Sequence, residues 1–363
     1  MNFESMEKLV HASLYEGYIL YPYRPTSVKN KVRWLFGGLY PKSYVGEQLG
    51  SESSKLVTQC LLEGGKAPSL TIKARFLHLT SRSVCVVDPP VSELLAKDEH
   101  LMKPVDMLRV EGRVLRPWEE SVEREIAVDG VGMGEKRRVP FTFAASRTVE
   151  PVKNASGQIV GALVRVQHEV NGVVEVDIAR VEGAGVENAI CKMTVSVENL
   201  TALDAGVDRD AAMLRTFASS HVMMGVEGSG FVSMTDPPAH LAEMVGAFVN
   251  QGAWPVLIGQ EGERSLMLSS PIIFSDYPQI APESPNDLFD ACEIDEILTL
   301  RIMTLTDDEK REMAAVDPRA RELLEKTELM GAEQLKSLHG AMRGHPGLGG
   351  PRTSSLERSG GDS

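Results

Sequence analysis

The chain has 363 residues and a formal net charge of −13, with 42% hydrophobic and 25% charged residues. This length suffices for one large domain or two ordinary ones, and the composition excludes wholesale disorder. Because the balance is acidic and no stretch is dense in Lys and Arg, nucleic acid and anionic membrane surfaces are not expected as main partners.

The sequence predicts a cytoplasmic protein without membrane insertion. The first residues carry no basic stretch followed by an apolar run, and nowhere do about 18 apolar residues run together. The cysteines form no C-x-x-C pair, which is typical of neither a disulfide framework nor a zinc or iron–sulfur site. They are Cys60, Cys85, Cys191 and Cys292. We therefore expect reduced thiols and predict no metal and no cofactor.

Residues 1–53 are an aromatic N-terminal segment. Six of the seven tyrosines precede residue 45, together with Trp34 and Phe36. Rings interleaved with arginines can stack and donate hydrogen bonds at once, as interface anchors do. The alternative is a first strand followed by a loop whose rings seal the edge of a sheet. The candidate partner-binding residues are Tyr18, Tyr21, Tyr23, Arg24, Arg33 and Trp34.

Residues 54–203 are predicted to form a β-rich, largely antiparallel domain. Apolar and polar residues alternate from Leu70 to Phe76, which indicates a half-buried strand. A later alternating run places Cys191 in a core, where it is expected to be a small buried hydrophobe. The Gly-rich stretch Asp129–Glu135 is expected to be a mobile loop.

Two runs of this domain predict a β-hairpin. Asn171-Gly172 separates the alternating runs Ile159–Val170 and Val173–Val181. Both central residues of a type I′ turn need a positive φ, which Asn and Gly tolerate best.

Residues 204–305 are predicted to form a smaller α/β layer. The expected strands are Met213–Val226, Phe231–Thr235, Trp254–Ile258 and Ser265–Ile273. Asp236-Pro237-Pro238 is expected to cap a helix over Ala239–Asn250, because Asp accepts hydrogen bonds from first-turn amides and proline is tolerated there. Asp88-Pro89-Pro90 repeats this pattern ahead of Val91–Lys97.

Two residues of this layer are candidates for ligand binding. His221 lies in a strand-like run and could act as a base or ligand if a carboxylate such as Asp236 oriented it. A hydrogen-bonded core histidine is the favoured interpretation of His221, and His78 is interpreted in the same way. The glycine-rich stretch Gly225–Gly230 is interpreted as a hairpin turn between strands, since a phosphate loop would need a helix directly after it.

An acidic block follows at residues 283–296. Its carboxylates could form a partner-binding surface, could hold a divalent cation, or could complement a helix dipole and face water. The candidate partner-binding residues here are Glu283, Asp287, Asp290 and Glu293.

The C-terminal part is predicted to be helical over residues 306–343. Thr306 and Glu309 form a capping box, and Pro318 is expected to start a second helix. Residues 344–363 are expected to be a disordered tail. The predicted fold class is therefore α+β, with a β-rich N-terminal domain, a smaller α/β layer and C-terminal helices.

Two blocks of the chain resemble a known family. Leu14–Arg24 with Arg33–Pro41, and Ile280–Pro285 with Glu293–Arg301, are similar to a family of uncharacterised bacterial proteins encoded in gene clusters for nickel–iron uptake hydrogenases. The resemblance implies an accessory role in hydrogenase assembly or maturation. It brings no catalytic residues to this chain.

The leading hypothesis is an accessory protein that binds a hydrogenase subunit or another maturation factor. The alternative is a metal-dependent enzyme or small-ligand-binding factor that uses His221, Asp236 and the acidic block near Asp287. A structural component of the mature complex is a third possibility. We favour binding over catalysis, because the sequence contains no recognisable set of catalytic residues.

Overall fold

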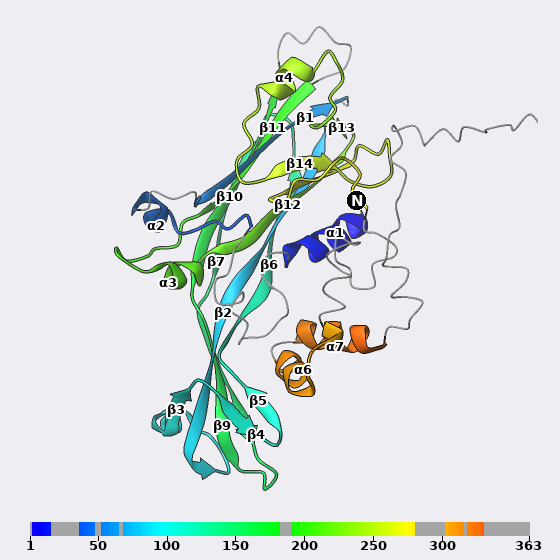
Figure 1. The fold of residues 1–363 in the computed structure, drawn as a ribbon. Helices are drawn as coiled ribbons and strands as arrows, with labels where there is room; N and C mark the ends of the chain where they lie inside the picture. The colour runs from blue at the N-terminus through cyan, green and yellow to red at the C-terminus, as the bar shows by residue number, and fades with distance from the viewer. Residues whose placement is uncertain are drawn as a thin grey trace, which may run out of the picture.

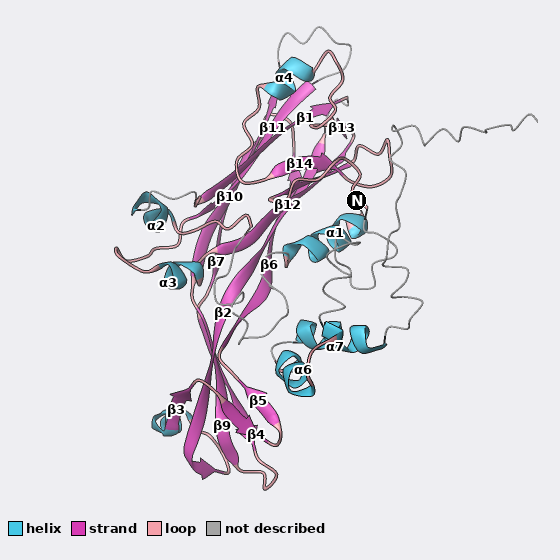
Figure 2. Ribbon diagram, viewed as in Figure 1, coloured by secondary structure: helices cyan, strands magenta, loops and turns pink. Residues whose placement is uncertain are grey.

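The computed structural model describes residues 2–15, 36–47, 52–64, 68–181, 190–279, 302–315 and 318–329. It consists mostly of antiparallel strands with a few helices, which confirms the predicted β-rich α+β fold (Figure 1, Figure 2). The helical elements are α1 (Glu4–Leu14), α2 (Lys42–Glu47), the 3₁₀ helix η2 (Ala96–Leu101), α3 (Arg209–Met213), α4 (Ala242–Gly246), α6 (Asp307–Ala314) and α7 (Pro318–Leu329).

The strands form two main sheets and one small hairpin. A five-stranded sheet has the order β13-β1-β11-β10-β7, with β1 (Lys55–Glu63), β7 (Lys136–Phe143), β10 (Val170–Arg180), β11 (Ile190–Asn199) and β13 (Gly230–Phe231). A larger sheet has the order β14-β15-β12-β2-β9-β8, with β2 (Ser69–Val91), β8 (Ser146–Lys153), β9 (Ile159–Gln167), β12 (Phe217–Glu227), β14 (Trp254–Leu257) and β15 (Leu266–Ser270). Strands β3 (Met102–Val105) and β6 (Trp118–Val131) also pair with β2, while β4 (Leu108–Val110) and β5 (Arg113–Leu115) form the hairpin.

The main core lies between the two sheets. The alternation predicted from Leu70 to Phe76 is confirmed, since the apolar residues of this run are buried in that core. Phe76 stacks on Phe217 with ring centroids 4.4 Å apart, so β2 and β12 share an aromatic centre. Cys191 on β11 is buried in the same core, as expected.

The predicted hairpin at Asn171-Gly172 is wrong. Both residues lie inside β10, where Gly172 pairs with Phe141 of β7 on one side and with Asn199 of β11 on the other. Strand β9 belongs to the other sheet, so the chain changes sheets at His168, before the Asn-Gly pair. Gly172 is required by close packing instead of by a turn. A Cβ there would lie 2.4 Å from Phe141 Cζ.

Neither Asp-Pro-Pro motif caps a helix, so both predicted caps are wrong. Asp88 and its prolines are among the last residues of β2, where the pairing with β9 shifts register between Val86 and Val91 and tolerates them. The next helix is η2. Asp236 lies in a turn, and α4 starts only after Leu241, without a side-chain cap.

Other elements between residues 129 and 235 also differ from their predicted bounds. The Gly-rich stretch is mostly strand and turn, because β6 continues to Val131. The strand expected to start at Met213 starts only at Phe217, because Met213 is the last residue of α3. Asp208 caps this helix by accepting a 2.8 Å hydrogen bond from the amide of Ala211. A turn does follow β12 at Gly228, but β12 and β13 belong to different sheets and form no hairpin.

The sheets run across residue 203, where the sequence predicts a boundary. Strand β12 pairs with β2, β14 and β15 extend the same sheet, and β13 pairs with β1. All of these pairings are antiparallel. The strands expected as an α/β layer therefore complete the sheets that β1 and β2 begin.

Strand β2 extends beyond the two-sheet core into a second lobe. It is 23 residues long, and its second half pairs with β9 and β3. Figure 1 shows β3, β4, β5 and β9 gathered beyond the point where the long strands converge. We call residues 82–116 and 146–167 the distal lobe. Its sheet carries the β4–β5 hairpin on one face and the η2 segment on the other, each over its own apolar cluster.

A network of charged side chains lies where the two lobes meet. Arg82 of β2 is buried, and its Nη1 donates to Glu120 Oε1 of β6 at 2.8 Å. The other oxygen of Glu120 accepts from Arg165 Nε of β9 at 2.6 Å, and Arg165 also reaches Glu150 of β8. One carboxylate thus joins strands β2, β6 and β9.

Replacing Glu120 with glutamine is expected to lower the free energy of unfolding by about 2 kcal/mol, because the buried guanidinium of Arg82 loses its counter-charge. Urea unfolding measures this loss. The matched control is Glu99→Gln, which removes a more exposed carboxylate from its pair with Arg147 and is expected to cost less than about 1 kcal/mol. Equal stability of the two variants would contradict a structural role for the network.

The C-terminal helices agree with their sequence signals. Thr306 and Glu309 form the predicted capping box, and α7 starts at Pro318. Leu323 and Leu324 of α7 are buried in a cluster that includes Trp118 of β6. The rest of the predicted helical stretch and the expected tail lie outside the described residues.

Candidate functional site

The residues predicted to bind a partner lie outside the described part of the chain. These are Tyr18, Tyr21, Tyr23, Arg24, Arg33 and Trp34 in the aromatic segment, and Glu283, Asp287, Asp290 and Glu293 in the acidic block. The residues that directly precede and follow segment 16–35 are described. They define the candidate site.

Helix α1 carries the chain to that site. Its apolar residues recur at helical spacing, at positions Met6, Leu9 and Val10, and pack with Phe3 on strands β12, β14 and β15. Their partners include Met223, Val256, Ile258, Leu266 and Leu268. The sequence analysis missed this helix, although the spacing of its apolar residues was a usable signal. One face of α1 is thus buried against the outer side of the larger sheet.

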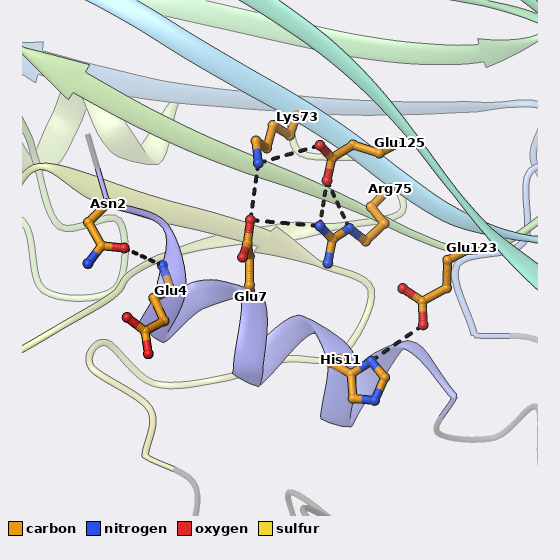
Figure 3. A network of polar contacts seen from close by, with 8 residues as sticks. All are labelled: Asn2, Glu4, Glu7, His11, Lys73, Arg75, Glu123 and Glu125. Atoms are coloured by element: carbon orange, nitrogen blue, oxygen red, sulfur yellow. Dashed lines mark hydrogen bonds and ion pairs between the residues drawn. The ribbon is translucent and has the colours of Figure 1, made fainter. Parts of the chain in front are cut away.

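Ion pairs next to this buried face connect α1 to strands β2 and β6 (Figure 3). Glu7 Oε1 lies 3.1 Å from Lys73 Nζ and 3.9 Å from the guanidinium of Arg75. Both cations also contact Glu125 of β6. One turn later, His11 Nδ1 lies 3.4 Å from Glu123. Because these groups are partly exposed, each pair contributes little energy, and their main effect is to set the direction of the helix.

The last turn of α1 is held by a buried histidine. Ser13 and His221 are 0% and 1% exposed, and Ser13 Oγ lies 3.1 Å from His221 Nε2. The other ring nitrogen, Nδ1, lies 2.8 Å from the carbonyl oxygen of Ser219, so it carries the proton and donates. Nε2 of the neutral ring therefore accepts from Ser13. Burial lowers the pKa of His221 to about 4, which keeps the ring neutral near pH 7.

This arrangement fits an anchor better than a catalytic dyad. Both ring nitrogens of His221 are occupied within the chain, and the partner of Nδ1 is a carbonyl instead of a carboxylate. Neither Ser13 nor His221 reaches solvent. The prediction of a hydrogen-bonded core histidine is therefore confirmed for His221. It also holds for His78, whose Nε2 lies 2.9 Å from the carbonyl oxygen of His168.

Strand β12 is irregular next to His221. Its pairing with β2 shifts register between Ala218 and His221, and Ser219 has a φ of 54°, which is strained for a residue with a side chain. The buried hydroxyl of Ser219 has no hydrogen-bond partner among the described residues. This bulge turns the carbonyl of Ser219 toward the histidine ring.

The residues that follow segment 16–35 contact the same bulge. The amide of Ser220 donates to the carbonyl oxygen of Gly37 at 3.0 Å, and Leu39 pairs with Phe217. Gly37 has a φ of 58° and packs so closely on Pro271 that a Cβ would lie 2.4 Å from it. Ser13 and Gly37 thus contact His221 and Ser220, two consecutive residues of β12. The described residues on the two sides of segment 16–35 are therefore held at one place.

Asp236, the residue expected to orient His221, lies in a turn whose contacts are with other residues. It is exposed, and its amide donates to Ser233 Oγ at 2.8 Å. Ser233 and Thr235 in turn donate to Asp276, which organises this turn. No described interaction joins Asp236 to His221, and the third part of that predicted pocket, near Asp287, lies outside the described residues.

The described cysteines are unpaired, and all three are buried: Cys60, Cys85 and Cys191. Burial raises the pKa of each thiol, so all three stay protonated near neutral pH. Cys292 lies outside the described residues. In the part of the chain that the structure describes, no group of three or more His, Cys, Asp and Glu side chains is placed to hold a metal ion. None of its helices has the length and apolar character needed to cross a membrane.

Comparison with known proteins adds no further assignment. No family model matches the chain, and no curated protein matches it.

Proposed function

We propose that this chain is an accessory protein in the assembly or maturation of a nickel–iron hydrogenase, and that it acts by binding another protein. The partner would be a hydrogenase subunit or a second maturation factor, met in the cytoplasm. The hydrogenase context comes from the sequence resemblance of the two end blocks. The binding mechanism is supported by one structural observation: Ser13 and Gly37, which lie on the two sides of segment 16–35, contact His221 and Ser220 of β12.

A segment whose flanking residues are held on a sheet is well suited to recognition. Binding residues are commonly found on loops that a rigid scaffold positions. Tyr, Trp and Arg are the residues most enriched among interface anchors, and segment 16–35 contains several of each type except tryptophan, of which it has one. Flanking residues held in place would limit the conformational freedom that such a segment loses on binding, which favours affinity.

The charge of the segment indicates the kind of surface it would meet. Arg24, Lys29, Lys31 and Arg33 make it locally basic within a chain of net charge −13. An acidic patch on the partner would complement it and would be repelled by most of the remaining protein. The acidic block at 283–296 would offer a second surface of opposite sign.

Deletion of the gene tests the biological context. The hydrogenase large subunit is then examined for its metal centre and for its processing state. An unprocessed, metal-free large subunit would support a role in maturation, and a loaded but inactive one would support a later role in assembly. A normal, fully active hydrogenase in the deletion strain would contradict the proposed function.

The double variant Arg24→Glu with Arg33→Glu is expected to weaken binding to the hydrogenase subunit by at least about tenfold, because two anchors reverse their charge. Biolayer interferometry with the purified full-length chain measures the affinity. The matched control is Lys136→Glu with Arg138→Glu, which reverses two exposed cations of β7 and leaves segment 16–35 intact. Equal affinity of the two double variants would show that the aromatic segment does not carry the contact.

A further inference from the structure

Strand β6 has a long unpaired edge. It pairs with β2 along its length, and β2 is its only strand partner in the described part of the chain. Among the described residues, no other hydrogen bond reaches the backbone of β6 between residues 121 and 129. Alternate residues of an antiparallel strand direct their N–H and C=O groups to the same side, so about half of these residues present both groups outward. We call residues 121–129 the acceptor edge, which is about 26 Å long at the spacing of a β-strand.

The other edges of the two main sheets are protected against the addition of a strand. A proline lacks the amide with which a new strand would pair, and a very short edge strand offers few groups. Each described edge strand other than β6 has one of these features: Pro104 in β3, Pro140 in β7, Pro151 in β8, Pro255 in β14 and the two-residue length of β13. Strand β6 has 14 residues and no proline. It is therefore the edge at which another strand can be added.

The interior beside the acceptor edge is incompletely covered. Strand β7 follows β6 after a short turn, and its inward side chains Val139, Phe141 and Phe143 are only partly buried against the main core. The rings of Phe141 and Phe143 have centroids 6.1 and 6.0 Å from that of Phe76, the residue of β2 that pairs with Arg124 of β6. Apolar side chains of an added strand that point inward would cover these rings, which favours binding.

The outward face of the acceptor edge keeps an acidic charge once its counter-ions are counted. Its carboxylates are Glu123, Glu125 and Asp129. One of them belongs to a neutral cluster of two acids and two cations, formed by Glu7, Glu125, Lys73 and Arg75 (Figure 3). Glu123 contacts the imidazole of His11, and Asp129 has no ion pair among the described residues. Two carboxylates without a Lys or Arg partner therefore remain on this face, about 20 Å apart.

Arg124 is the only cation in the sequence of the acceptor edge, and it faces the interior. Its Nη2 donates to Gln167 Oε1 at 2.8 Å, and its guanidinium lies 4.7 Å from the centroid of the Phe143 ring. The guanidinium and the outward carboxylates thus lie on opposite faces of the sheet. A basic side chain of an added strand is attracted on the outward face and repelled on the inward face. This difference sets which way an alternating strand would face.

A second copy of the chain is a poor occupant of the acceptor edge. Antiparallel pairing of β6 with itself places acids opposite acids on the outward face. With the two-fold axis at residue 123, 124 or 125, the facing pairs are Glu123 with Glu123, Glu123 with Glu125, or Glu125 with Glu125. Like charges that lie directly opposite destabilise a sheet. The same carboxylates attract a strand whose outward side chains are basic.

We propose that the acceptor edge binds an extended segment of a partner protein as an added β-strand, with apolar side chains facing β7 and basic side chains facing Glu123 and Asp129. Main-chain hydrogen bonds supply affinity in this mode of recognition, and the alternating side chains supply specificity. This inference rests on the proposed function, because it assumes that the chain acts by binding protein.

Fluorescence anisotropy with the full-length protein tests the acceptor edge. The probe is a fluorescein-labelled eight-residue peptide in which valine and lysine alternate. It is expected to bind at least about tenfold more tightly than a peptide in which valine and glutamate alternate, and at least about tenfold more tightly than four valines followed by four lysines. The last peptide keeps the composition and net charge and removes only the alternation. Equal binding of the three peptides, or no binding of the probe, would overturn the assignment.

Methylation of the peptide backbone tests strand pairing directly. Since alternate residues of a strand direct their N–H groups to the same side, either the valines or the lysines of the probe donate to β6. N-methylation of one set should therefore abolish binding, and N-methylation of the other set should be tolerated. Equal binding of the two methylated peptides would show that the contact does not depend on strand pairing and would overturn the proposal.

Asp129→Lys is expected to weaken binding of the probe at least about fivefold and to strengthen binding of the valine–glutamate peptide, because it reverses an outward charge of the acceptor edge. The matched control is Glu261→Lys, which reverses an exposed carboxylate in the turn between β14 and β15 and should bind like the parent. Thermal unfolding verifies that both variants are folded. Equal affinity of the two variants for the probe would exclude the acceptor edge as its site.

Sedimentation equilibrium of the parent chain tests the alternative occupant. A monomer is expected, because the acidic faces of two copies repel each other. A dimer that the valine–lysine probe dissociates would show that β6 pairs with itself, and this result would overturn the assignment to a partner protein.

The acceptor edge and the hydrogenase context can fail separately. If a hydrogenase subunit binds the chain and none of the peptides does, the proposed function stands and the acceptor edge falls. If the peptides and Asp129→Lys behave as expected and the deletion strain makes normal hydrogenase, the acceptor edge stands and the hydrogenase context falls.

Discussion

Between pH 6.5 and pH 4, the protein is expected to lose roughly 3 kcal/mol of unfolding free energy for each of two histidines, His78 and His221, which are fully buried in the described part of the chain. Burial lowers the pKa of both side chains from 6.5 to about 4. Nearby cations act in the same direction, Arg124 beside His78 and Arg75 beside His221. The unfolded chain therefore binds these two protons at a higher pH than the folded chain does.

The direction of the effect follows from this difference in proton binding. Above pH 6.5 both states hold neutral imidazoles, so the stabilisation is fully present. As the pH falls toward 4, the unfolded state takes up protons that the folded state refuses, and the free energy of unfolding drops by about 1.4 kcal/mol per pH unit for each histidine. At His221 protonation would reverse the hydrogen bond to Ser13, because a protonated Nε2 donates to the hydroxyl oxygen and the hydroxyl proton can go to the carbonyl oxygen of Leu9, 3.0 Å away.

Urea unfolding at half-unit steps of pH measures this slope. His221→Gln is expected to be less stable at pH 7, since glutamine fills the site poorly, but its stability should depend less steeply on pH. His78→Gln should behave in the same way. If His221→Gln keeps the full slope of the parent, the buried imidazole is not the titrating group.

Local signals in the sequence predicted local structure correctly. The alternation in β2 follows from burial on one face, and the capping box at Thr306 satisfies the first amides of α6 without help from distant residues. The burial of Cys191 likewise follows from its place in an alternating strand. In each case, neighbours within a few residues determine the outcome.

Predictions that depended on tertiary partners were less successful. The dipeptide Asn171-Gly172 is typical of a turn, but here it lies inside a strand, where the rings of Phe141 and Phe217 pack against the glycine. The chain has already passed from one sheet to the other before this pair. Asp236 is of a residue type that commonly caps helices, but its turn is organised by Asp276, which lies 40 residues later in the sequence. A short motif is compatible with several structures, and distant packing selects among them.

The site at β12 could be predicted only in part. His221 stands out in the sequence and was correctly interpreted as a core histidine. Its partner Ser13 is 208 residues away, and no periodicity or motif connects the two. The strained conformation of Ser219 is equally invisible in the sequence, because serine is not selected for a positive φ. Only the helical spacing in α1 offered a signal that could have been used.

Replacing Gly172 with alanine is expected to destabilise the protein by about 2 kcal/mol, and replacing it with valine by more than about 3 kcal/mol. The new Cβ would lie 2.4 Å from Phe141 Cζ and 2.8 Å from the ring of Phe217. Phe217 is fully buried and stacked on Phe76, so it has no room to move. Phe141 is half-buried on the edge strand β7 and is the ring that must shift.

A double-mutant cycle separates this packing from a turn. Gly→Ala also destabilises a type I′ turn, but only the strand arrangement predicts that Phe141→Leu rescues part of the loss, by about 1 kcal/mol of coupling energy. The control is Gly46→Ala in α2, where nothing lies within 4 Å of a new Cβ and alanine should be neutral or mildly stabilising. Additive effects of Gly172→Ala and Phe141→Leu would contradict the close contact between β10 and β7, and with it the strand order of the five-stranded sheet.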